Sequence, residues 1–347
     1  MGFLYRKLVR RLLFGFNPEL AHNAAIRSAG VLQSFKLANL ITELLSKAKD
    51  FPVSVAGLKF KNPVGLAAGF DKDCEVPKFL SRLGFGFLEL GTVTLRPQNG
   101  NPKPRLFRIS EKKALINRMG FNNAGAYQAA RSLERLLPLD IPVGINIGKN
   151  ADCSLALAPK NYLEALKILY PYGDYFAVNI SSPNTLQLRE LHQKEKLESL
   201  LDPMLDFASG QKIKKPFFIK ISPDLEASEL ESAVSTAVSR GFGLIASNTT
   251  TRRDGLPQRW QNHEGGLSGA LLKKLADQIL KKTAMLAAGR VPIIGVGGVC
   301  DGPSAIKKLR LGADLVQVYS GLIYEGPFLV KEILEYMDKI GYRGGAR

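Results

Sequence analysis

The feature that most constrains the fold is an alternation of short apolar runs with longer amphipathic stretches, which begins near residue 51 of this 347-residue chain. Eight runs have the length and composition of buried strands, at about 63–69, 86–92, 142–147, 175–181, 217–222, 243–248, 292–296 and 315–319. Helical spacing separates most of them, as in residues 124–137, 162–169, 228–239 and 270–288. Eight such alternations over about 270 residues predict an α/β fold, a (β/α)8 TIM barrel, rather than an open sheet.

Two smaller units precede the barrel strands. Residues 51–60, with a turn at Gly57, predict a hairpin. Residues 1–46 predict a small N-terminal extension of amphipathic helices, which leaves residues 47–347 to the barrel. In the first helix, which Asn17-Pro18 ends, apolar side chains fill one broad arc of a helical wheel. The opposite arc holds four basic side chains, Arg6, Lys7, Arg10 and Arg11.

These N-terminal helices have two interpretations. Further amphipathic stretches follow at about 19–28 and 33–46. A basic face opposite Leu, Phe and Tyr is typical of a helix that lies in a membrane interface, and a terminal helix packed on its own protein has the same pattern. The chain has no run of 18 or more apolar residues and no apolar segment typical of a secretory signal. We therefore expect no segment that spans a bilayer, and both interpretations of the N-terminal helices remain open.

The net charge is +17, from 48 Lys and Arg against 31 Asp and Glu. Such an excess indicates an anionic partner, and the alternative is that it only keeps the protein soluble. No zinc-finger spacing and no RNA-binding aromatic motif is present, so nucleic acid is less expected than the other anionic partners, an anionic membrane surface or a phosphorylated ligand. The three cysteines, Cys74, Cys153 and Cys300, have neither disulfide nor metal-ligand spacing, which favours a reducing compartment and predicts no metal site.

Glycine and polar residues follow almost every predicted strand, at the end where barrel enzymes build their active sites. Glycine turns after the last two strands, Gly297-Gly298 and Ser320-Gly321, would let backbone N–H groups approach a phosphate. Five amides lie at or after strand ends: Asn117, Asn146, Asn179, Asn184 and Asn248. Amides suit a planar ligand with alternating C=O and N–H groups, such as a pyrimidine or a flavin edge.

The remaining chemistry is limited to cations and hydroxyls. Lys72 and Lys220, at strand ends, would neutralise a carboxylate or the negative charge of a reduced flavin. No histidine ends a barrel strand, and no nucleophile elbow or phosphate-binding Walker loop is present. The proton carrier is then a hydroxyl in residues 181–185, which requires a dry and organised site.

Several long motifs in order carry a resemblance to a known family over about residues 50–335. They are A-A-G-F-D-K (67–72), N-P-K-P-R-L-F-R (101–108), I-N-R-M-G-F-N-N (116–123), I-N-I-G-K-N (145–150), N-I-S-S-P-N-T (179–185), N-T-T (248–250), G-G-L-S-G (265–269) and V-Q-V-Y-S-G (316–321). With these motifs the chain resembles the dihydroorotate dehydrogenases, specifically the membrane-associated class 2 enzymes.

The resemblance implies that the chain oxidises dihydroorotate to orotate in pyrimidine biosynthesis, with FMN as the hydride acceptor and a membrane quinone as the final acceptor. It implies a catalytic base at Ser182, where the soluble class 1 enzymes have Cys, with Thr185 and Phe121 guiding the exit of the proton. The substrate would be held by Lys72, Asn117, Arg118, Met119, Gly120, Phe121, Asn179, Asn184, Asn248 and Thr249.

The same resemblance implies the cofactor and quinone sites. FMN would contact Ala68, Gly69, Lys72, Thr92, Asn146, Asn179, Lys220, Ser247, Gly269, Gly298, Tyr319 and Ser320, the phosphate lying at the last four. His22 and Arg108 match positions that would line a quinone tunnel formed by the N-terminal helices. We expect a monomeric, peripheral membrane protein at the cytoplasmic face of a bacterial inner membrane, because an Arg- and Ser-rich mitochondrial transit peptide is lacking.

The chain departs from the family pattern at two positions. Ser247 stands where Thr is frequent, and Cys74 stands two residues beyond Lys72, where Gly is common. We expect Cys74 to be a buried bystander, and the alternative is a thiol whose oxidation would affect the enzyme. The rival functions are a related FMN barrel acting on another dihydropyrimidine or a 2-hydroxy acid, and a non-catalytic basic barrel that binds nucleic acid.

Overall fold

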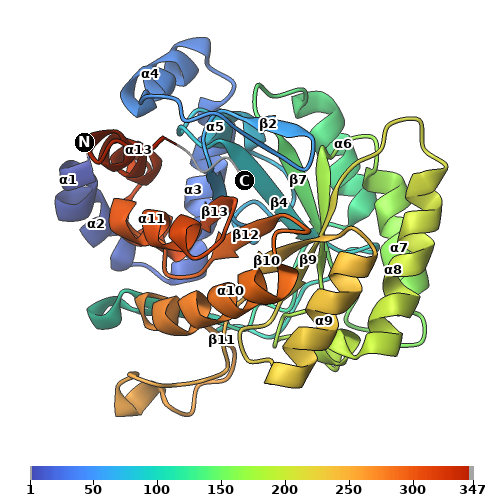
Figure 1. Cartoon of the computed structure of the whole chain (residues 1–347). Coiled ribbons are helices and arrows are strands. Elements are labelled where there is room, and N and C mark those ends of the chain that lie inside the picture. Colours follow the sequence, from blue (N-terminus) through green and yellow to red (C-terminus); the bar gives the residue numbers. More distant parts are fainter. Residues whose placement is uncertain (1, 344–347) are drawn as a thin grey trace.

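Eight parallel strands close into a barrel in the computed structural model, which describes residues 2–343 (Figure 1). In chain order the barrel strands are β3 (Val64–Leu66), β4 (Phe87–Val93), β7 (Val143–Ile147), β8 (Tyr175–Asn179), β9 (Phe217–Ile221), β10 (Gly243–Ala246), β12 (Ile293–Val296) and β13 (Leu315–Val318). Pairing of β13 with β3, in which Val316 is opposite Val64, closes the barrel. All eight predicted strands and the predicted TIM barrel are confirmed.

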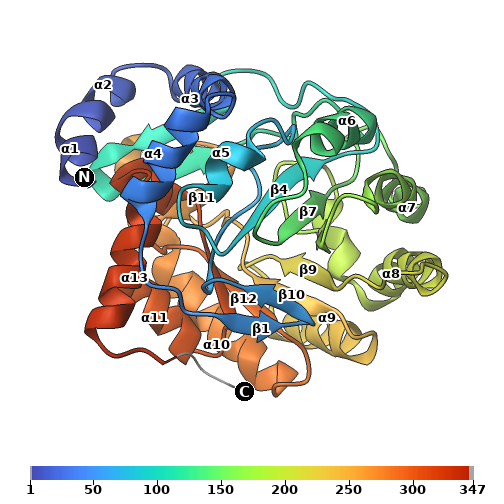
Figure 2. The same cartoon turned by 90° about the horizontal axis from the view of Figure 1, so that it is seen from above.

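Helices surround the barrel because their apolar faces pack on the outer side chains of the strands (Figure 2). They are α5 (Pro77–Ser81), α6 (Ala126–Leu136), α7 (Ala158–Leu169), α8 (Lys194–Ser209), α9 (Ala227–Ser239), α10 (Lys273–Ala287), α11 (Gly302–Arg310), α12 (Ser320–Glu325) and α13 (Leu329–Lys339). The predicted helix at 162–169 begins four residues earlier, with Pro159 in its first turn, where a missing N–H costs nothing.

The predicted hairpin is present as β1 (Val53–Val55) and β2 (Leu58–Phe60), joined by a turn in which Gly57 has a φ of 78°. Its Phe60 ring lies 5.3 Å from the ring of Phe87, which points into the barrel. Further rings continue this layer, with Tyr175 lying 5.3 Å from Phe218. The hairpin therefore packs on the interior side chains at the amino ends of the strands and closes that end of the barrel.

A three-stranded antiparallel sheet, which the sequence analysis did not predict, lies beside the opposite end of the barrel. It consists of β5 (Leu106–Ile109), β6 (Ala114–Asn117) and β11 (Gly266–Gly269) in the order β11-β6-β5. Asn117 is opposite Gly266 in this sheet, and Ala114 is opposite Gly269. The sheet thus brings an amide of the long second connection next to the glycines of a much later loop.

The N-terminal extension consists of α1 (Gly2–Leu4), a π-helical turn at Tyr5–Val9, α2 (Arg10–Phe14), α3 (Pro18–Leu32) and α4 (Lys36–Ser46). Asn17 caps α3 by accepting the N–H of Glu19 at 2.9 Å. This cap starts a new helix directly after α2, as the sequence Asn17-Pro18 predicted. Basic side chains fasten the first helices to the barrel: Arg6 pairs with Glu332 at 3.0 Å, and Arg10 donates to the carbonyl of Tyr324 at 2.8 Å.

The apolar side chains of this extension face outward. Leu8 and Leu12 are 62% and 68% exposed, whereas half of the basic arc is used for docking on the barrel. Fourteen of the large exposed apolar side chains belong to the extension: Phe3, Leu4, Leu8, Val9, Leu12, Phe16, Leu20, Val31, Leu32, Phe35, Leu37, Leu40, Ile41 and Leu44. Within residues 2–343, none of the helices combines the length and the hydropathy needed to span a bilayer.

Candidate active site

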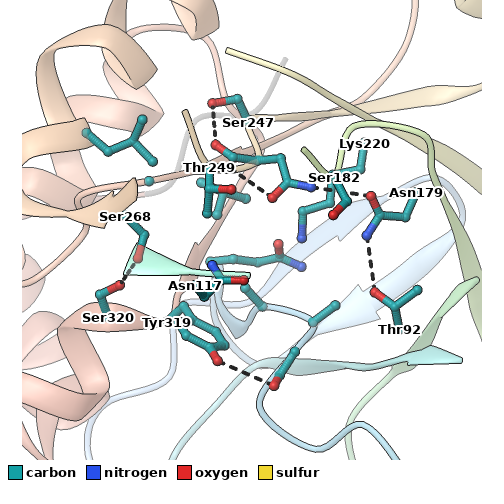
Figure 3. Close-up of a pocket in the computed structure, with 18 of the residues that line it drawn as sticks. Thr92, Asn117, Asn179, Ser182, Lys220, Ser247, Thr249, Ser268, Tyr319 and Ser320 are labelled. Carbon is teal, nitrogen blue, oxygen red and sulfur yellow. Dashed lines mark hydrogen bonds between the residues drawn. The ribbon is translucent and has the colours of Figure 1, made fainter. Parts of the chain in front are cut away.

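A cavity of about 1000 Å³, measured to its open mouth, lies at the carboxyl ends of the barrel strands (Figure 3). Its wall contains Ser182 and most of the predicted cofactor and substrate positions. These are Ala68, Gly69, Lys72, Thr92, Asn117, Met119, Gly120, Phe121, Asn179, Asn184, Lys220, Ser247, Asn248, Thr249, Gly269, Gly298, Tyr319 and Ser320. The fold thus brings into one cavity residues that are up to 252 positions apart in the chain, from Ala68 to Ser320.

A hydrogen-bond network of amides and hydroxyls forms one side of the cavity. Thr92 donates to the Oδ1 atom of Asn146 at 2.6 Å, and the amide of Asn179 donates to Thr92 at 3.1 Å. The amide of Asn248 donates to Ser181 at 2.9 Å and to Asn179 at 3.3 Å. Because each amide is oriented by another polar group, the groups that remain free have fixed directions toward a ligand.

A buried carboxylate beneath this network was missed by the sequence analysis. Glu89, in the middle of β4, is 1% exposed and lies 3.4 Å from the ammonium of Lys220. It also accepts hydrogen bonds from Asn146 at 2.8 Å and from Gln317 at 2.7 Å. A glutamate inside the apolar strand sequence F-L-E-L-G was the signal that could have identified it, because an acidic side chain in a barrel core requires partners.

Ser182 lies in the irregular segment that follows β8, and its side chain points into the cavity (Figure 3). The residue is 6% exposed, and its Oγ atom accepts the N–H of Asn184 at 3.2 Å. The amide of Asn184 in turn donates to the carbonyl oxygen of Asn117 at 3.1 Å. The Oγ1 atom of Thr185 is buried and has no hydrogen-bond partner among the described residues. The segment therefore holds one positioned hydroxyl and one that remains available.

Lys72 and Asp71 follow the first barrel strand and have different surroundings. Burial lowers the pKa of Lys72, an effect opposed by the nearby carboxylates of Asp73 and Glu19. Burial raises the pKa of Asp71 to about 6, although its carboxylate accepts the backbone N–H groups of Glu75 at 2.8 Å and of Val76. Asp71 thereby shapes the turn that presents Lys72 to the cavity.

The glycine positions at the other end of the cavity are required by the backbone. Gly298 has a φ of 73°, and a Cβ atom there would lie 2.5 Å from the Cβ of Lys273. Gly269 has a φ of 90°, and a Cβ there would lie 2.3 Å from the carbonyl oxygen of Lys113. The hydroxyls of Ser268 and Ser320 are 2.8 Å apart beside them. This end thus brings backbone and the hydroxyls of two serines to the cavity wall, which suits a phosphate site.

Five predicted site residues lie outside the cavity wall, and one of them is Thr185, described above. Asn146 is beneath the wall, in the network described above. Arg118 turns away and donates to the carbonyl of Pro104 at 3.0 Å. Arg108 donates to the carbonyl of Leu13 at 3.0 Å and lies 4.4 Å from the centre of the Phe14 ring, so it holds the end of α2.

His22 lines a second cavity, of about 690 Å³, between α3 and the loop after β3. Its ring lies 5.2 Å from that of Phe70, and burial lowers its pKa to about 4. Lys72 and Met119 belong to the walls of both cavities. The two cavities therefore adjoin each other at Lys72 and Met119.

Cys74 lies behind this wall and is completely buried. Burial raises the pKa of its thiol well above the ordinary range, which opposes formation of the reactive thiolate. Its φ of 56° places it in the left-handed region that glycine favours. These surroundings favour the buried bystander over the reactive thiol.

Comparisons with known proteins agree with this geometry. The family described as "Dihydroorotate dehydrogenase" matches residues 51–340. "Dihydroorotate dehydrogenase (quinone)" of Shewanella sp. (strain MR-4) is 44% identical over 338 residues, which cover 96% of this chain and 98% of the relative. The protein of the same name from Erythrobacter litoralis (strain HTCC2594) is 45% identical over 333 residues, which cover 96% and 94%.

Solved structures show the same likeness in three dimensions. The crystal structure of DHODH from Eimeria tenella in complex with ferulenol has a TM-score of 0.85 and 34% sequence identity, and the match covers 95% of this chain and 96% of that one. The ligand-free form has a TM-score of 0.86 and 33% identity, with 94% and 97% covered. The chain belongs to the dihydroorotate dehydrogenase family, and within it to the quinone enzymes.

Proposed function

We propose that this chain oxidises dihydroorotate to orotate in de novo pyrimidine biosynthesis, with FMN as the hydride acceptor and a membrane quinone as the final electron acceptor. The observation that carries the proposal is a single cavity whose wall contains Ser182, Lys72 and several oriented amides. The names of the relatives, which are dihydroorotate dehydrogenases (quinone), support the same reaction.

The residues of the cavity fit FMN. The Oε1 atom of Gln317 is buried at the cavity wall without a hydrogen-bond partner among the described residues, so a ligand N–H would satisfy it. Lys220, Thr92 and Asn179 would hold the polar edge of the ring system, and the backbone at Gly298 with the hydroxyl of Ser320 would hold the phosphate. Bound FMN would supply the two-electron acceptor that no side chain of the cavity provides.

Ser182 would take the proton from one ring carbon of dihydroorotate while a hydride leaves the adjacent carbon. Since the hydroxyl already carries a proton, Ser182 would release that proton as it accepts the one from carbon, and the N–H of Asn184, which already donates to its Oγ atom, would stabilise the partial negative charge that the release leaves. The unpaired hydroxyl of Thr185, three residues along the chain, would organise the removal of the proton. The low exposure of both residues would keep competing water away.

The amides and Lys72 would orient the substrate. Asn117, Asn184 and Asn248 come from three separate segments and present both donors and acceptors, as a ring with C=O and N–H groups requires. The carboxylate of dihydroorotate would pair with Lys72, whose charged form is disfavoured by burial until such a partner arrives. Binding of the substrate is therefore expected to offset that desolvation.

The N-terminal extension, residues 1–46, would bring the barrel of residues 47–347 to a membrane and admit the quinone. The outward apolar side chains of α2, α3 and α4 support a peripheral attachment, and the basic composition supports an anionic surface. The cavity at His22 shares Lys72 and Met119 with the active-site cavity and supports quinone access on this side. We propose a monomer at the cytoplasmic face of a bacterial inner membrane.

The deciding experiment is a visible absorption spectrum of the purified protein, recorded anaerobically before and after dihydroorotate is added. We expect a flavin spectrum that bleaches, followed by reoxidation when a quinone is supplied. A bound flavin that stays oxidised with dihydroorotate would contradict the substrate and point to another dihydropyrimidine or a 2-hydroxy acid. A protein that neither contains nor binds FMN would contradict the proposal as a whole.

A further inference from the structure

We propose that Arg189, held in place by Asp224, is a positioning residue that fixes the segment carrying Ser182 against the loop carrying Asn248 and Thr249. The inference rests on the proposed function, because it gives Arg189 the task of aiming the base that the reaction requires. Arg189 does not line the cavity, and the one cavity-lining residue to which it donates a hydrogen bond, Thr249, is contacted at its backbone carbonyl. Its effect would be exerted entirely through backbone atoms.

The guanidinium of Arg189 connects two functional segments. Its Nε atom donates to the carbonyl oxygen of Ser181 at 3.2 Å, one residue before the proposed base. Its Nη2 atom donates to the carbonyl oxygen of Thr249 at 3.3 Å, in the loop after β10. A planar group with donors in fixed directions can hold two carbonyls at one separation, which the single ammonium of a lysine cannot do.

Asp224, in the loop after β9, fixes the guanidinium from the other side. Its Oδ2 atom lies 3.0 Å from the Nη1 atom of Arg189, and Asp224 is mostly buried. The same carboxylate accepts the N–H of Thr251 at 2.8 Å and the hydroxyl of Thr250. Loops after three consecutive barrel strands, β8, β9 and β10, are therefore joined at one ion pair.

The Ser182 segment needs such a fastening. It leaves the barrel after Asn179 and has no strand partner before the 3-10 turn at Leu188–His192. Within it, the side chain of Leu186 is 80% exposed and Gln187 has a φ of 56°. A displacement of about 1 Å in a catalytic group costs about 100-fold in rate, so a loop of this kind requires a tether close to its reactive residue.

The test compares the rate constant for anaerobic reduction of bound FMN by dihydroorotate in the holoenzyme and its variants. Arg189→Ala should lower this rate constant by about 10- to 100-fold. Arg189→Lys and Asp224→Asn should give smaller losses, because part of the linkage remains. The matched control is Arg240→Ala, which removes a similarly buried arginine that pairs with Asp202 and Glu198. Its rate constant should equal that of the wild type.

A double-mutant cycle separates positioning from a general loss of structure. In a Ser182→Ala background, Arg189→Ala should change the residual rate by less than about threefold, because there is no base left to aim. An equal fold-loss in both backgrounds would overturn the proposal, and so would an unchanged rate for Arg189→Ala in the wild-type background. The thermal midpoint of each variant shows that folded protein is being compared.

A second readout does not depend on the substrate. Amide hydrogen exchange of residues 180–187 should be faster in Arg189→Ala than in the wild type, while exchange in α8 stays the same. Unchanged exchange in that segment would overturn the tether whatever the enzyme oxidises. Conversely, exchange of residues 180–187 could be faster in Arg189→Ala although dihydroorotate does not reduce the flavin of the wild type. That result would support the tether and contradict only the proposed substrate.

Discussion

The ammonium nitrogen of Lys220 lies 3.4 Å from the Oε1 atom of Glu89 inside the barrel, where both side chains are almost completely buried. Asn146, Gln317 and the hydroxyl of Tyr175 also donate to this carboxylate, so its charge is shared among a cation, two amides and a hydroxyl. Such a pair contributes little net stability by itself, but removing one partner leaves the other charge uncompensated. The pair therefore fixes the position of Lys220 at the base of the active-site cavity.

From this relationship we predict that Glu89→Gln lowers the free energy of unfolding by about 3–5 kcal/mol, the usual effect of leaving a buried charge without its partner. Urea unfolding followed by the fluorescence of Trp260, the single tryptophan of the chain, measures the change. Adding Lys220→Met should recover most of the loss. The control is Glu198→Gln at the partly exposed pair with Arg240, near the protein surface, where a loss above about 1 kcal/mol is not expected.

Replacement of the proposed base gives the second prediction. Ser182→Ala should retain FMN and bind orotate, yet reduce FMN with dihydroorotate about 10²- to 10⁴-fold more slowly, the range of general base catalysis. Stopped-flow absorbance in the absence of oxygen measures the rate constant. Ser209→Ala, on the exposed end of α8, should behave like the wild type. Wild-type kinetics in Ser182→Ala would exclude this serine as the base.

The buried His192 predicts a dependence of stability on pH. Burial lowers its pKa to about 4, so the folded protein keeps the ring neutral while the unfolded chain protonates it near pH 6.5. Because the unfolded state then binds more protons, stability is fully present above about pH 6.5 and declines as the pH falls toward 4. His192→Gln should reduce the slope of unfolding free energy against pH in this window. An identical slope in the variant would contradict the assignment.

Attachment to membranes gives the fourth prediction. On α4, Leu37, Leu40, Ile41 and Leu44 are exposed and spaced so that they form one apolar stripe. Leu40→Glu with Ile41→Glu should weaken binding to vesicles of anionic phospholipid by at least about tenfold, since each buried apolar side chain contributes about 1.5–3 kcal/mol. Sedimentation with vesicles measures the partition. Glutamate at the exposed Met285 of α10 is the control and should leave binding unchanged.

The barrel was predictable because its strands are local signals. Each apolar run can be recognised from a few consecutive residues, and segments with helical spacing separate most of the runs. The sheet of β5, β6 and β11 was not predicted, because its strands lie within long connections between barrel strands, and the sequence G-L-S-G of β11 has little strand propensity. Its register depends on pairing between Asn117 and Gly266, which are far apart in the chain.

Some residues of the candidate site could be predicted from the sequence for the same reason, and others could not. Motif positions such as Ser182 and Asn248 could be assigned to a barrel mouth because a strand end fixes where the next residues lie. Glu89 and Gln317, 228 positions apart, become partners only when the barrel closes. Arg118 stands inside a predicted motif, but the side-chain direction depends on the neighbouring carbonyl of Pro104, which local sequence does not reveal.

The hairpin of β1 and β2 limits the side from which substrate and quinone can reach the active site of the proposed enzyme. Because Phe60 packs on Phe87, the hairpin covers the end of the barrel at which the strands begin. The active-site cavity opens at the other end. A water-soluble acid and a lipid-soluble quinone must therefore be received on the same side of the molecule, by separate approaches. Electrons would therefore enter and leave at the carboxyl ends of the barrel strands and not through the end that the hairpin covers.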